Sequence, residues 1–217
     1  KMQLGKWGLV VVDLQRYYIE KQANFVAYFE HLHHGATHYV SHRCRNLVIP
    51  NLVETLVPVR KVGRPVIYLK LCGTRPDRSD LHRHFQKVYR EALDEGFPDL
   101  YPLAHEPLAE VVPEVAPQTG DLVIDKTTYS GFTSSDIELE LRKLGLDTLV
   151  MAGLATSQCV ETTARDASDR GFRIIHLEDA QADYHEVTHQ ASLFASRAVC
   201  GGHVLSCQEF TQLLGQA

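Results

Sequence analysis

Short apolar runs alternate along the chain with segments whose apolar residues recur at helical spacing. Each run is rich in β-branched residues and too short for a typical helix, which indicates a buried strand. These predicted strands cover residues 8–13, 64–71, 121–126, 148–152 and 172–177, and a shorter one covers 203–206. We expect the long runs to lie in a parallel sheet, because parallel strands are usually covered on both faces.

Between these runs, apolar residues three and four positions apart predict helices. The expected helices cover residues 38–62, 80–93, 135–144 and 183–198, and two more begin near residues 156 and 207. Strands that alternate with helices through right-handed crossovers build a mostly parallel sheet with helices on both faces. The sequence therefore predicts a three-layer α/β/α fold with a Rossmann-like sheet of about six strands, in a single domain over residues 1–217.

The segment 17–45 breaks this alternation because it is aromatic, irregular and rich in histidine. We expect a surface excursion here, and its first part, residues 17–39, is a candidate for a lid or a subunit contact. The histidines show no metal-binding motif, which favours a surface location for them; they are His31, His33, His34, His38 and His42.

The chain has 217 residues, with 27 acidic and 22 basic side chains and a formal net charge of −5. This balance argues against a nucleic-acid-binding surface and against a polybasic membrane patch. No apolar run reaches the ~18 residues of a membrane-spanning helix, and the first strand begins too early to leave room for a signal peptide. The five cysteines are scattered and form no CxxC pair, so we expect reduced thiols in a cytoplasmic protein.

Cys159 follows the predicted strand 148–152 and the turn at Gly153, in the first turn of the next helix. Thr156 or Ser157 is the expected N-cap of that helix, because either hydroxyl can accept a hydrogen bond from an unpaired amide. The positive end of the helix dipole favours a thiolate here, and ligands bind at the carboxyl ends of parallel strands. A nucleophile is one interpretation of Cys159, and a small buried core residue is the other.

Two further strands end in charged groups, Asp13 and Lys126. Because the carboxyl ends of parallel strands meet at one edge of the sheet, Asp13, Lys126 and Cys159 can converge there. An ammonium beside Cys159 would lower the pKa of the thiol, and Asp13 could accept its proton and return it to a leaving amine. Taken singly, Asp13 could be a turn residue and Lys126 a solvated charge, but the combination favours a site.

Three segments, VVVDLQ, VIDKTTYSGF and GLATSQCVETTARDA, resemble in order and spacing the signature segments of the isochorismatase-like cysteine hydrolases. The resemblance covers essentially the whole chain and implies a catalytic triad of Asp13, Lys126 and Cys159. It also implies an oxyanion hole formed by the backbone amides of Ala155 and Cys159, with a cis peptide between Leu154 and Ala155. The implied activity is hydrolysis of a C–N bond in a small amide through a thioester intermediate. A homo-oligomer, either a dimer or a tetramer, is also implied.

The segment DKTTYSGF is similar to the branch that hydrolyses ureido and carbamoyl compounds, which includes biuret hydrolase, ureidoacrylate amidohydrolase and N-carbamoylsarcosine amidohydrolase. We therefore expect a small-molecule substrate of this class. The expected substrate-binding residues combine polar groups with aromatic walls: Gln15, Arg75, Tyr129, Phe132 and Gln158. Packing of the turn is the alternative for the two aromatic residues, and a solvated charge is the alternative for Arg75.

A nicotinamidase-type amidase is the nearest alternative, and the resemblance implies for that branch a metal held by an Asp-x-His pair and another histidine. The segment after strand 64–71 lacks a clear Asp-x-His, and the pair His82 and His84 lies on a polar stretch typical of a solvated face. We therefore expect no metal and no cofactor. A non-catalytic binding protein on the same fold is a further alternative. No GxGxxG follows the first strand and the chain has no P-loop, which argues against a nucleotide-binding protein. Ser130 lacks a GxSxG elbow, which argues against a serine hydrolase.

Overall fold

The structure is a computed structural model that describes residues 4–215. Its centre is a sheet of six parallel strands in the order β3-β2-β1-β4-β5-β6, which is the order of a Rossmann-type sheet. The strands are β1 (Trp7–Val12), β2 (Val66–Leu71), β3 (Leu122–Lys126), β4 (Thr148–Leu154), β5 (Arg173–Ala182) and β6 (His203–Leu205). The predicted strands are therefore present, and β4 and β5 extend further than the sequence indicated.

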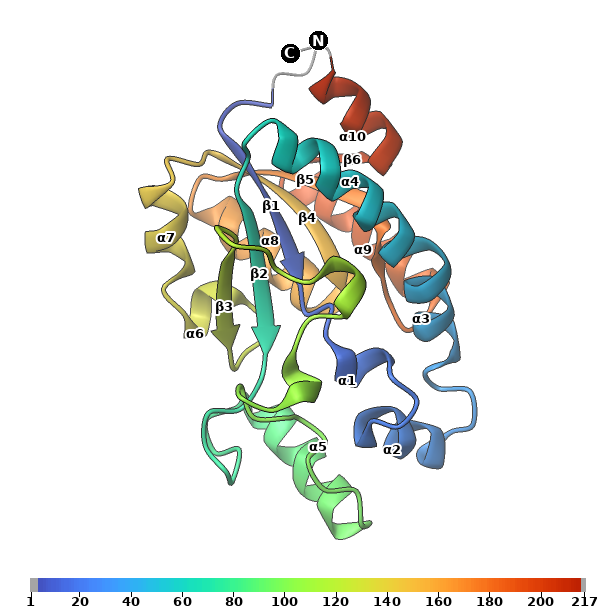
Figure 1. Cartoon of the computed structure of the whole chain (residues 1–217). Helices are drawn as coiled ribbons and strands as arrows, with labels where there is room; N and C mark the ends of the chain where they lie inside the picture. The colour runs from blue at the N-terminus through green and yellow to red at the C-terminus, as the bar shows by residue number, and fades with distance from the viewer. Residues whose placement is uncertain (1–3, 216–217) are drawn as a thin grey trace.

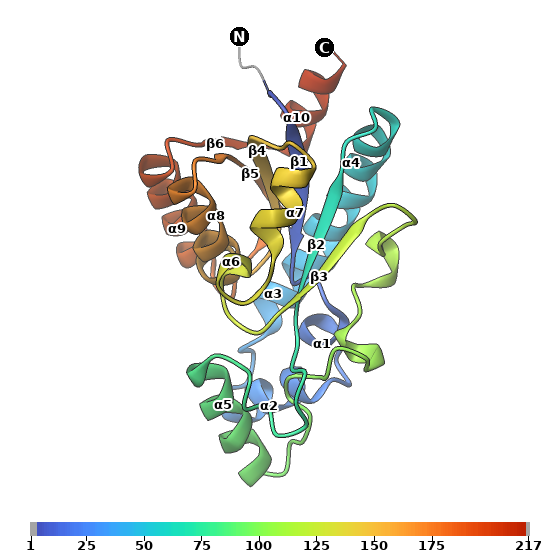
Figure 2. The ribbon, with the colours of Figure 1, turned by 90° about the vertical axis from the view of Figure 1, so that its left-hand side faces the viewer.

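Helices cover both faces of this sheet, as Figures 1 and 2 show. One face carries α4 (Ile49–Lys61) and α10 (Cys207–Leu214), with α3 (His38–Arg43) and a π-helical segment η1 (Cys44–Val48) leading into α4. The other face carries α6 (Gly131–Ser134), α7 (Ile137–Lys143), α8 (Glu161–Asp169) and α9 (Glu186–Val199). This arrangement confirms the predicted three-layer α/β/α fold. None of the helices within residues 4–215 combines the length and the apolar character needed to cross a membrane.

The side chains of β1 show how the two layers are held together. Leu9 and Val11 lie in the core on the side of α4, whereas Val10 and Val12 lie in the core on the side of α7 and α8. Every residue of this central strand is buried, and each large apolar side chain contributes about 1.5–3 kcal/mol by leaving water. A one-residue shift in register would move these side chains to the opposite core, so the position of the carboxyl end of β1 is well determined.

Strand β3 lies at the edge of the sheet, and the prediction that it is buried on both faces is wrong. Leu122 and Ile124 pack against the core, whereas Val123 and Asp125 are exposed. Lys126 at the end of the strand is completely buried. One face of β3 is therefore open to solvent, and the strand contributes to the interior mainly through its last residue.

Helix α3 begins at His38, where the predicted helix 38–62 also begins. Before it, the segment predicted to be an irregular surface excursion contains two helices, α1 (Arg16–Ile19) and α2 (Asn24–Leu32). They lie beyond the carboxyl ends of the strands, where α5 (Arg83–Asp94) also lies (Figure 1). Tyr17 and Phe25 are buried, and their ring centroids lie 6.3 and 5.9 Å from that of Tyr101 in a distant loop. The prediction was wrong because local sequence does not show which distant side chain will cover an aromatic ring.

Candidate active site

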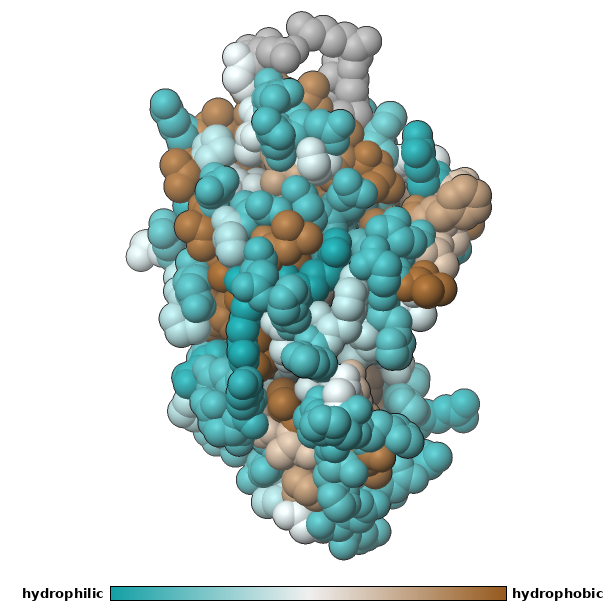
Figure 3. Space-filling model, turned by 90° about the vertical axis from the view of Figure 1, so that its right-hand side faces the viewer, coloured by the Kyte–Doolittle hydropathy of each residue, from teal (hydrophilic) through white to brown (hydrophobic). Residues whose placement is uncertain are grey.

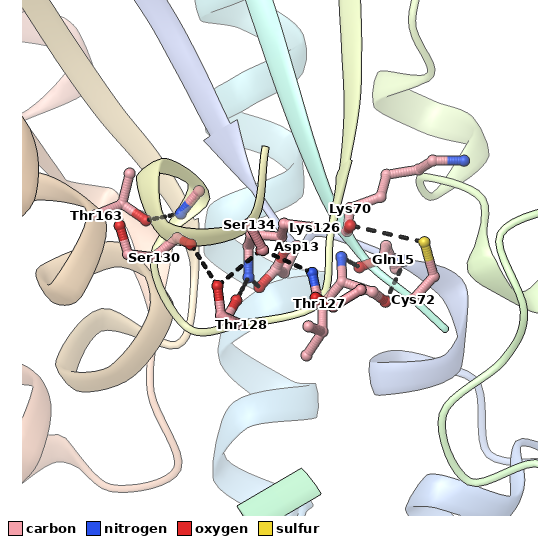
Figure 4. Close-up of polar contacts among 12 residues, drawn as sticks. Asp13, Gln15, Lys70, Cys72, Lys126, Thr127, Thr128, Ser130, Ser134 and Thr163 are labelled. Atoms are coloured by element: carbon pink, nitrogen blue, oxygen red, sulfur yellow. Dashed lines mark hydrogen bonds and ion pairs between the residues drawn. The ribbon is translucent and has the colours of Figure 1, made fainter. Parts of the chain in front are cut away.

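The carboxyl ends of β1, β3 and β4 place Asp13, Lys126 and Cys159 around one point at the edge of the sheet. Asp13 follows β1 in a left-handed conformation with φ of 48°, and its amide donates to the carbonyl of Leu69 over 2.9 Å. Lys126 ends β3, and its Nζ lies 2.8 Å from Oδ2 of Asp13 (Figure 4). The side chains of Lys126 and Asp13 are 0% and 1% exposed, so this ion pair is shielded from solvent.

The turn after β3 holds the Lys126 ammonium in place (Figure 4). Nζ of Lys126 donates to the carbonyl of Thr128 over 2.9 Å. The Thr128 hydroxyl in turn donates to the carbonyl of Ser130 over 2.8 Å, and it lies 2.8 Å from the hydroxyl of Ser134. The Ser134 hydroxyl also accepts a hydrogen bond from the amide of Thr127 over 3.0 Å. These contacts order the turn, so the ammonium is directed at the neighbouring carboxylate.

Cys159 lies in a π-helical turn, η4 (Thr156–Val160), that separates β4 from α8. β4 ends in a cis peptide between Leu154 and Ala155, and the Ala155 carbonyl accepts a hydrogen bond from the amide of Gln158 over 3.0 Å. Short π-helical turns often occur at functional sites. The backbones of Ala155 and Cys159 therefore belong to the same compact turn, at the position where the family resemblance implies an oxyanion hole.

The predicted N-caps of this helix, Thr156 and Ser157, do not cap it through their hydroxyls. The Thr156 hydroxyl instead donates to the carbonyl of Ala182 over 3.1 Å and lies 2.8 Å from Nδ1 of His189. The Ser157 amide donates to Oδ2 of Asp183 over 2.8 Å, so a carboxylate that follows β5 caps the turn from another strand. Sequence reasoning did not single out Asp183, because the predicted strand ended at residue 177 whereas β5 extends to Ala182.

The pKa of the Cys159 thiol is raised, and the expectation that its surroundings lower it is wrong. Burial is the largest cause because a thiolate would lose its hydration, and the negative charge of Asp13 adds to the effect. Lys126 acts in the opposite direction without outweighing these two causes. Cys159 is therefore a protonated thiol at neutral pH, and its reaction as a nucleophile requires a base.

Burial also raises the pKa of Asp13, although the nearby charge of Lys126 and contact with Cys159 act to lower it. For Lys126 the balance is different: burial opposes its charge, but Asp13 and Cys159 favour it, and its pKa is raised overall. A carboxylate with a raised pKa is a stronger base than an exposed aspartate. The electrostatics thus allow Asp13 to accept a proton while Lys126 stays charged.

Gln15 is buried with its amide bonded to backbone groups, which argues against the predicted contact with a substrate. Its Nε2 donates to the carbonyls of Leu71 and Ala109 over 3.1 and 2.7 Å, and its Oε1 accepts from the amide of Leu71 over 2.8 Å. The side chain is completely buried. Gln15 therefore joins the end of β2 to the loop around Ala109. Its position just after β1 in the sequence does not reveal these contacts.

Two other predicted substrate-binding residues also lie away from the cavity beside the cysteine. Arg75 is exposed in the loop after β2. Phe132 packs against Phe172 with 6.1 Å between ring centroids, and the guanidinium of Arg170 lies 4.9 Å from its ring. Packing of the turn, the alternative interpretation for Phe132, is what the structure shows. Of the predicted set, the structure brings Tyr129 and Gln158 to the cavity.

A cavity of about 670 Å³ lies beside the three strand-end residues. Its wall is aromatic and rich in histidine, and it consists of Tyr18, Phe25, Phe29, His33, His34, Gly35, Ala36, His84, Phe85, Val88, Tyr101, Tyr129, Gln158, Tyr184 and His185. Burial raises the pKa of Tyr18, Tyr101, Tyr129 and Tyr184, and each of these side chains is near enough to interact electrostatically with Cys159. Figure 3 shows hydrophobic residues among hydrophilic ones at this lower end of the molecule.

Most of this wall was not predicted from the sequence. Segment 17–39 supplies several of its residues, and the interpretations of this segment as a lid or as a subunit contact both stay predictions. The density of aromatic residues in that segment was the available signal. The contributions of α5 and of Tyr184 had no comparable signal, because they come from segments that pack here only in the folded chain.

The pair His82 and His84 begins helix α5. Nδ1 of His82 accepts a hydrogen bond from the amide of His84 over 3.2 Å, and the His82 ring packs 5.1 Å from that of Tyr129. Within residues 4–215, no group of three or more histidine, cysteine, aspartate or glutamate side chains is placed to hold a metal ion. His82 therefore caps the start of α5, and His84 lies in the wall of the cavity.

The sequence and the structure are both similar to known proteins. Nicotinamidase 3 of Arabidopsis thaliana is 38% identical over 148 residues, which cover 67% of this chain and 69% of that protein. Ureidoacrylate amidohydrolase RutB of Pseudomonas syringae pv. syringae (strain B728a) is 32% identical over 209 residues, which cover 88% of this chain and 74% of that protein.

Structural similarity extends over the whole fold. The crystal structure of a cysteine hydrolase from Pseudomonas syringae pv. phaseolicola 1448A matches with a TM-score of 0.77 at 26% identity, over 99% of this chain and 95% of that chain. The sequence model of the Isochorismatase domain matches residues 8–209, a range that contains Asp13, Lys126 and Cys159. The chain therefore belongs to the isochorismatase family.

Proposed function

We propose that this protein is a cysteine-dependent amidohydrolase that cleaves a C–N bond of a small amide, ureido or carbamoyl substrate. The observation that carries the proposal is the buried pair of Asp13 and Lys126, 2.8 Å apart and close to the Cys159 thiol. Buried ion pairs are often no more stabilising than apolar residues of similar volume, which favours a chemical role for this one. The amidohydrolase and the nicotinamidase among the relatives support the reaction class.

In the proposed mechanism, Asp13 takes the proton of the Cys159 thiol as the sulfur attacks the substrate carbonyl carbon. The backbone amides of Ala155 and Cys159 donate to the oxyanion, and Lys126 stabilises the negative charge. Collapse of this intermediate breaks the C–N bond, and Asp13 gives its proton to the leaving nitrogen. Water then attacks the thioester, and Asp13 passes a proton from that water to the departing sulfur, so the acid and the free thiol are regenerated.

Ammonia release from a panel of small amides tests this proposal. The panel contains biuret, ureidoacrylate, N-carbamoyl amino acids, nicotinamide and simple carboxamides. We expect Cys159→Ala to lower turnover by about 10³-fold or more, because the nucleophile acts as one unit with its base. Cys200→Ala is the matched control, since Cys200 lies partly buried beside Ser196 on α9 and outside the cavity wall. Turnover that survives Cys159→Ala would contradict the proposal.

Nicotinamide hydrolysis with a bound metal is a second candidate, favoured by the similarity to a nicotinamidase. A chelator separates the two candidates. Turnover of nicotinamide that the chelator abolishes supports the metal-containing branch, whereas chelator-resistant turnover of ureido or carbamoyl compounds supports the first proposal. If no amide in the panel is hydrolysed and iodoacetamide does not modify the Cys159 thiol, the results favour a non-catalytic binding protein.

A homo-oligomer, either a dimer or a tetramer, remains part of this proposal. Val187 and Phe194 lie seven positions apart on α9, and they are 76% and 80% exposed. Exposed apolar residues on one helix face are typical of a protein–protein contact. Light scattering after size-exclusion chromatography measures the mass directly, and Phe194→Glu should lower it if α9 forms the contact.

A further inference from the structure

The described wall of the cavity beside Cys159 contains four histidines but no permanently charged side chain. Among residues 4–215, the fifteen that line it include no aspartate, glutamate, lysine or arginine. Phe85 lies between Tyr101 and Tyr129, with ring centroids 5.3 and 4.5 Å away, and Phe25 lies 5.9 Å from Tyr101. These rings form a continuous aromatic surface against which an apolar group can pack.

Lys126, Arg78 and Arg43 have their charges engaged by other groups of the protein. Lys126 is paired within the strand-end cluster. Nε of Arg78 donates to the carbonyl of Tyr101 over 2.7 Å, and Nη2 of Arg43 donates to the carbonyl of Glu178 over 2.9 Å. A carboxylate bound against the described wall would therefore find no lysine or arginine in that wall to pair with it, and an unpaired buried carboxylate is strongly disfavoured.

The size of the cavity and its hydroxyl groups also favour an uncharged ligand with a large apolar group. A volume of about 670 Å³ is typical of sites for drug-sized ligands, and it far exceeds the volume of a biuret-sized molecule. Burial raises the pKa of Tyr18 and of Tyr101 well above the ordinary value, so both stay neutral hydroxyls. Neutral tyrosine hydroxyls hydrogen-bond to uncharged polar groups without requiring a charged partner.

We infer that the substrate of this site is an uncharged amide that carries an aromatic or extended apolar group. The inference rests on the proposed amidohydrolase function and narrows it. It excludes anionic members of the ureido and carbamoyl class, such as ureidoacrylate and N-carbamoyl amino acids, as preferred substrates. Selectivity for neutral over anionic amides comes from the aromatic wall and from its lack of lysine and arginine among the described residues.

A matched pair of amides tests the inference. 4-Methylbenzamide and 4-carboxybenzamide are similar in size and differ in charge, and 4-phenylbenzamide adds a second ring. The assays are run at about pH 8, above the range in which histidine ordinarily titrates. We expect kcat/KM for the neutral amide to exceed that for the anionic one by about 100-fold or more, since the carboxylate is left unpaired. The second ring should raise kcat/KM further.

A cation introduced into the wall should reverse part of this preference. Val88 is a partly buried wall residue on α5, and Val88→Lys should reduce the ratio of neutral to anionic kcat/KM by about tenfold. Val57→Lys is the matched control, because Val57 is 67% exposed on α4 and is not part of the wall. This control should leave the ratio unchanged.

The outcomes separate this inference from the proposed function. Equal or better turnover of the anionic amide overturns the inference, while loss of all turnover in Cys159→Ala still supports the amidohydrolase. Turnover that persists in Cys159→Ala contradicts the proposed function, and the neutral-to-anionic ratio still decides the substrate class. If none of these amides is hydrolysed, calorimetric titration measures how tightly Cys159→Ala binds the neutral and the anionic amide. Tighter binding of the neutral amide supports the inference, and any other result overturns it.

Discussion

Replacing Lys126 by methionine tests the buried ion pair independently of any substrate. Methionine keeps most of the aliphatic volume, but Asp13 loses its partner at 2.8 Å and the carbonyl of Thr128 loses a donor. Coulomb's law with an effective dielectric constant of about 20 gives about 6 kcal/mol for two unit charges at this distance. Because the lysine no longer has to be desolvated, part of this energy is recovered. We therefore expect the free energy of unfolding to fall by about 3–5 kcal/mol at neutral pH.

This loss should depend on pH with a defined sign. Burial raises the pKa of folded Asp13, and removal of Lys126, whose charge lowers that pKa, raises it further. Between its unfolded and its folded pKa, such a carboxyl binds more protons in the folded state, so the stability of the variant rises as pH falls. The destabilisation should therefore shrink as pH falls from neutral toward the ordinary pKa of an aspartate. Adding Asp13→Asn to Lys126→Met should bring stability back to within about 1–2 kcal/mol of wild type.

Urea unfolding followed by tryptophan fluorescence measures these differences. Trp7 is the single tryptophan of the chain and is buried at the start of β1, so its emission reports on the sheet. Lys87→Met is the control, because Lys87 is 68% exposed and lies 3.6 Å from Glu91, a pair worth less than about 1 kcal/mol. A Lys126→Met protein within about 1 kcal/mol of wild type near pH 8 would refute the reasoning.

Gly153→Ala should abolish soluble expression or cost more than about 4 kcal/mol in urea unfolding, since a Cβ there would meet the β1 backbone at 2.0 Å. Gly171→Ala, also at positive φ but with open space around the Cβ, should cost about 1–2 kcal/mol. Burial lowers the pKa of His176 from 6.5 to about 4, so the folded state resists its protonation. Wild-type stability should therefore fall by about 3 kcal/mol as pH drops through this range, and His176→Gln should reduce that dependence. Asp13→Asn should slow iodoacetamide modification of Cys159, measured by intact mass, because the buried protonated thiol loses the base that takes its proton; an unchanged rate would contradict this account.

Local patterns in the sequence determined the strands of the sheet and, to within one residue, the carboxyl ends of β1, β2 and β3. The apolar run 8–13 became a strand with every residue buried, because such runs are stable only between two helical layers. Parallel topology then carries strand ends to one edge, which is why Asp13, Lys126 and Cys159 could be expected to converge. The same local reasoning overestimated the burial of β3, because it does not show which strand lies at the edge.

Tertiary structure decided the electrostatics of the site. Position at a helix start predicted a lowered thiol pKa, but Cys159 is buried beside Asp13 and its pKa is raised. Gln15 likewise follows a strand end, yet its amide is occupied by backbone groups from two distant segments. These outcomes depend on burial and on distances between residues far apart in the chain, and neither quantity has a local pattern.

The cavity shows the same division between local and distant determinants. Aromatic residues at 17–29 were visible in the sequence, but their location beside Cys159 depends on Tyr101 and on α5, which come from later segments. Secondary structure follows periodicity because each residue responds to neighbours a few positions away. A cavity wall and a shifted pKa arise from contacts between segments separated by tens of residues, so only the folded chain determines them.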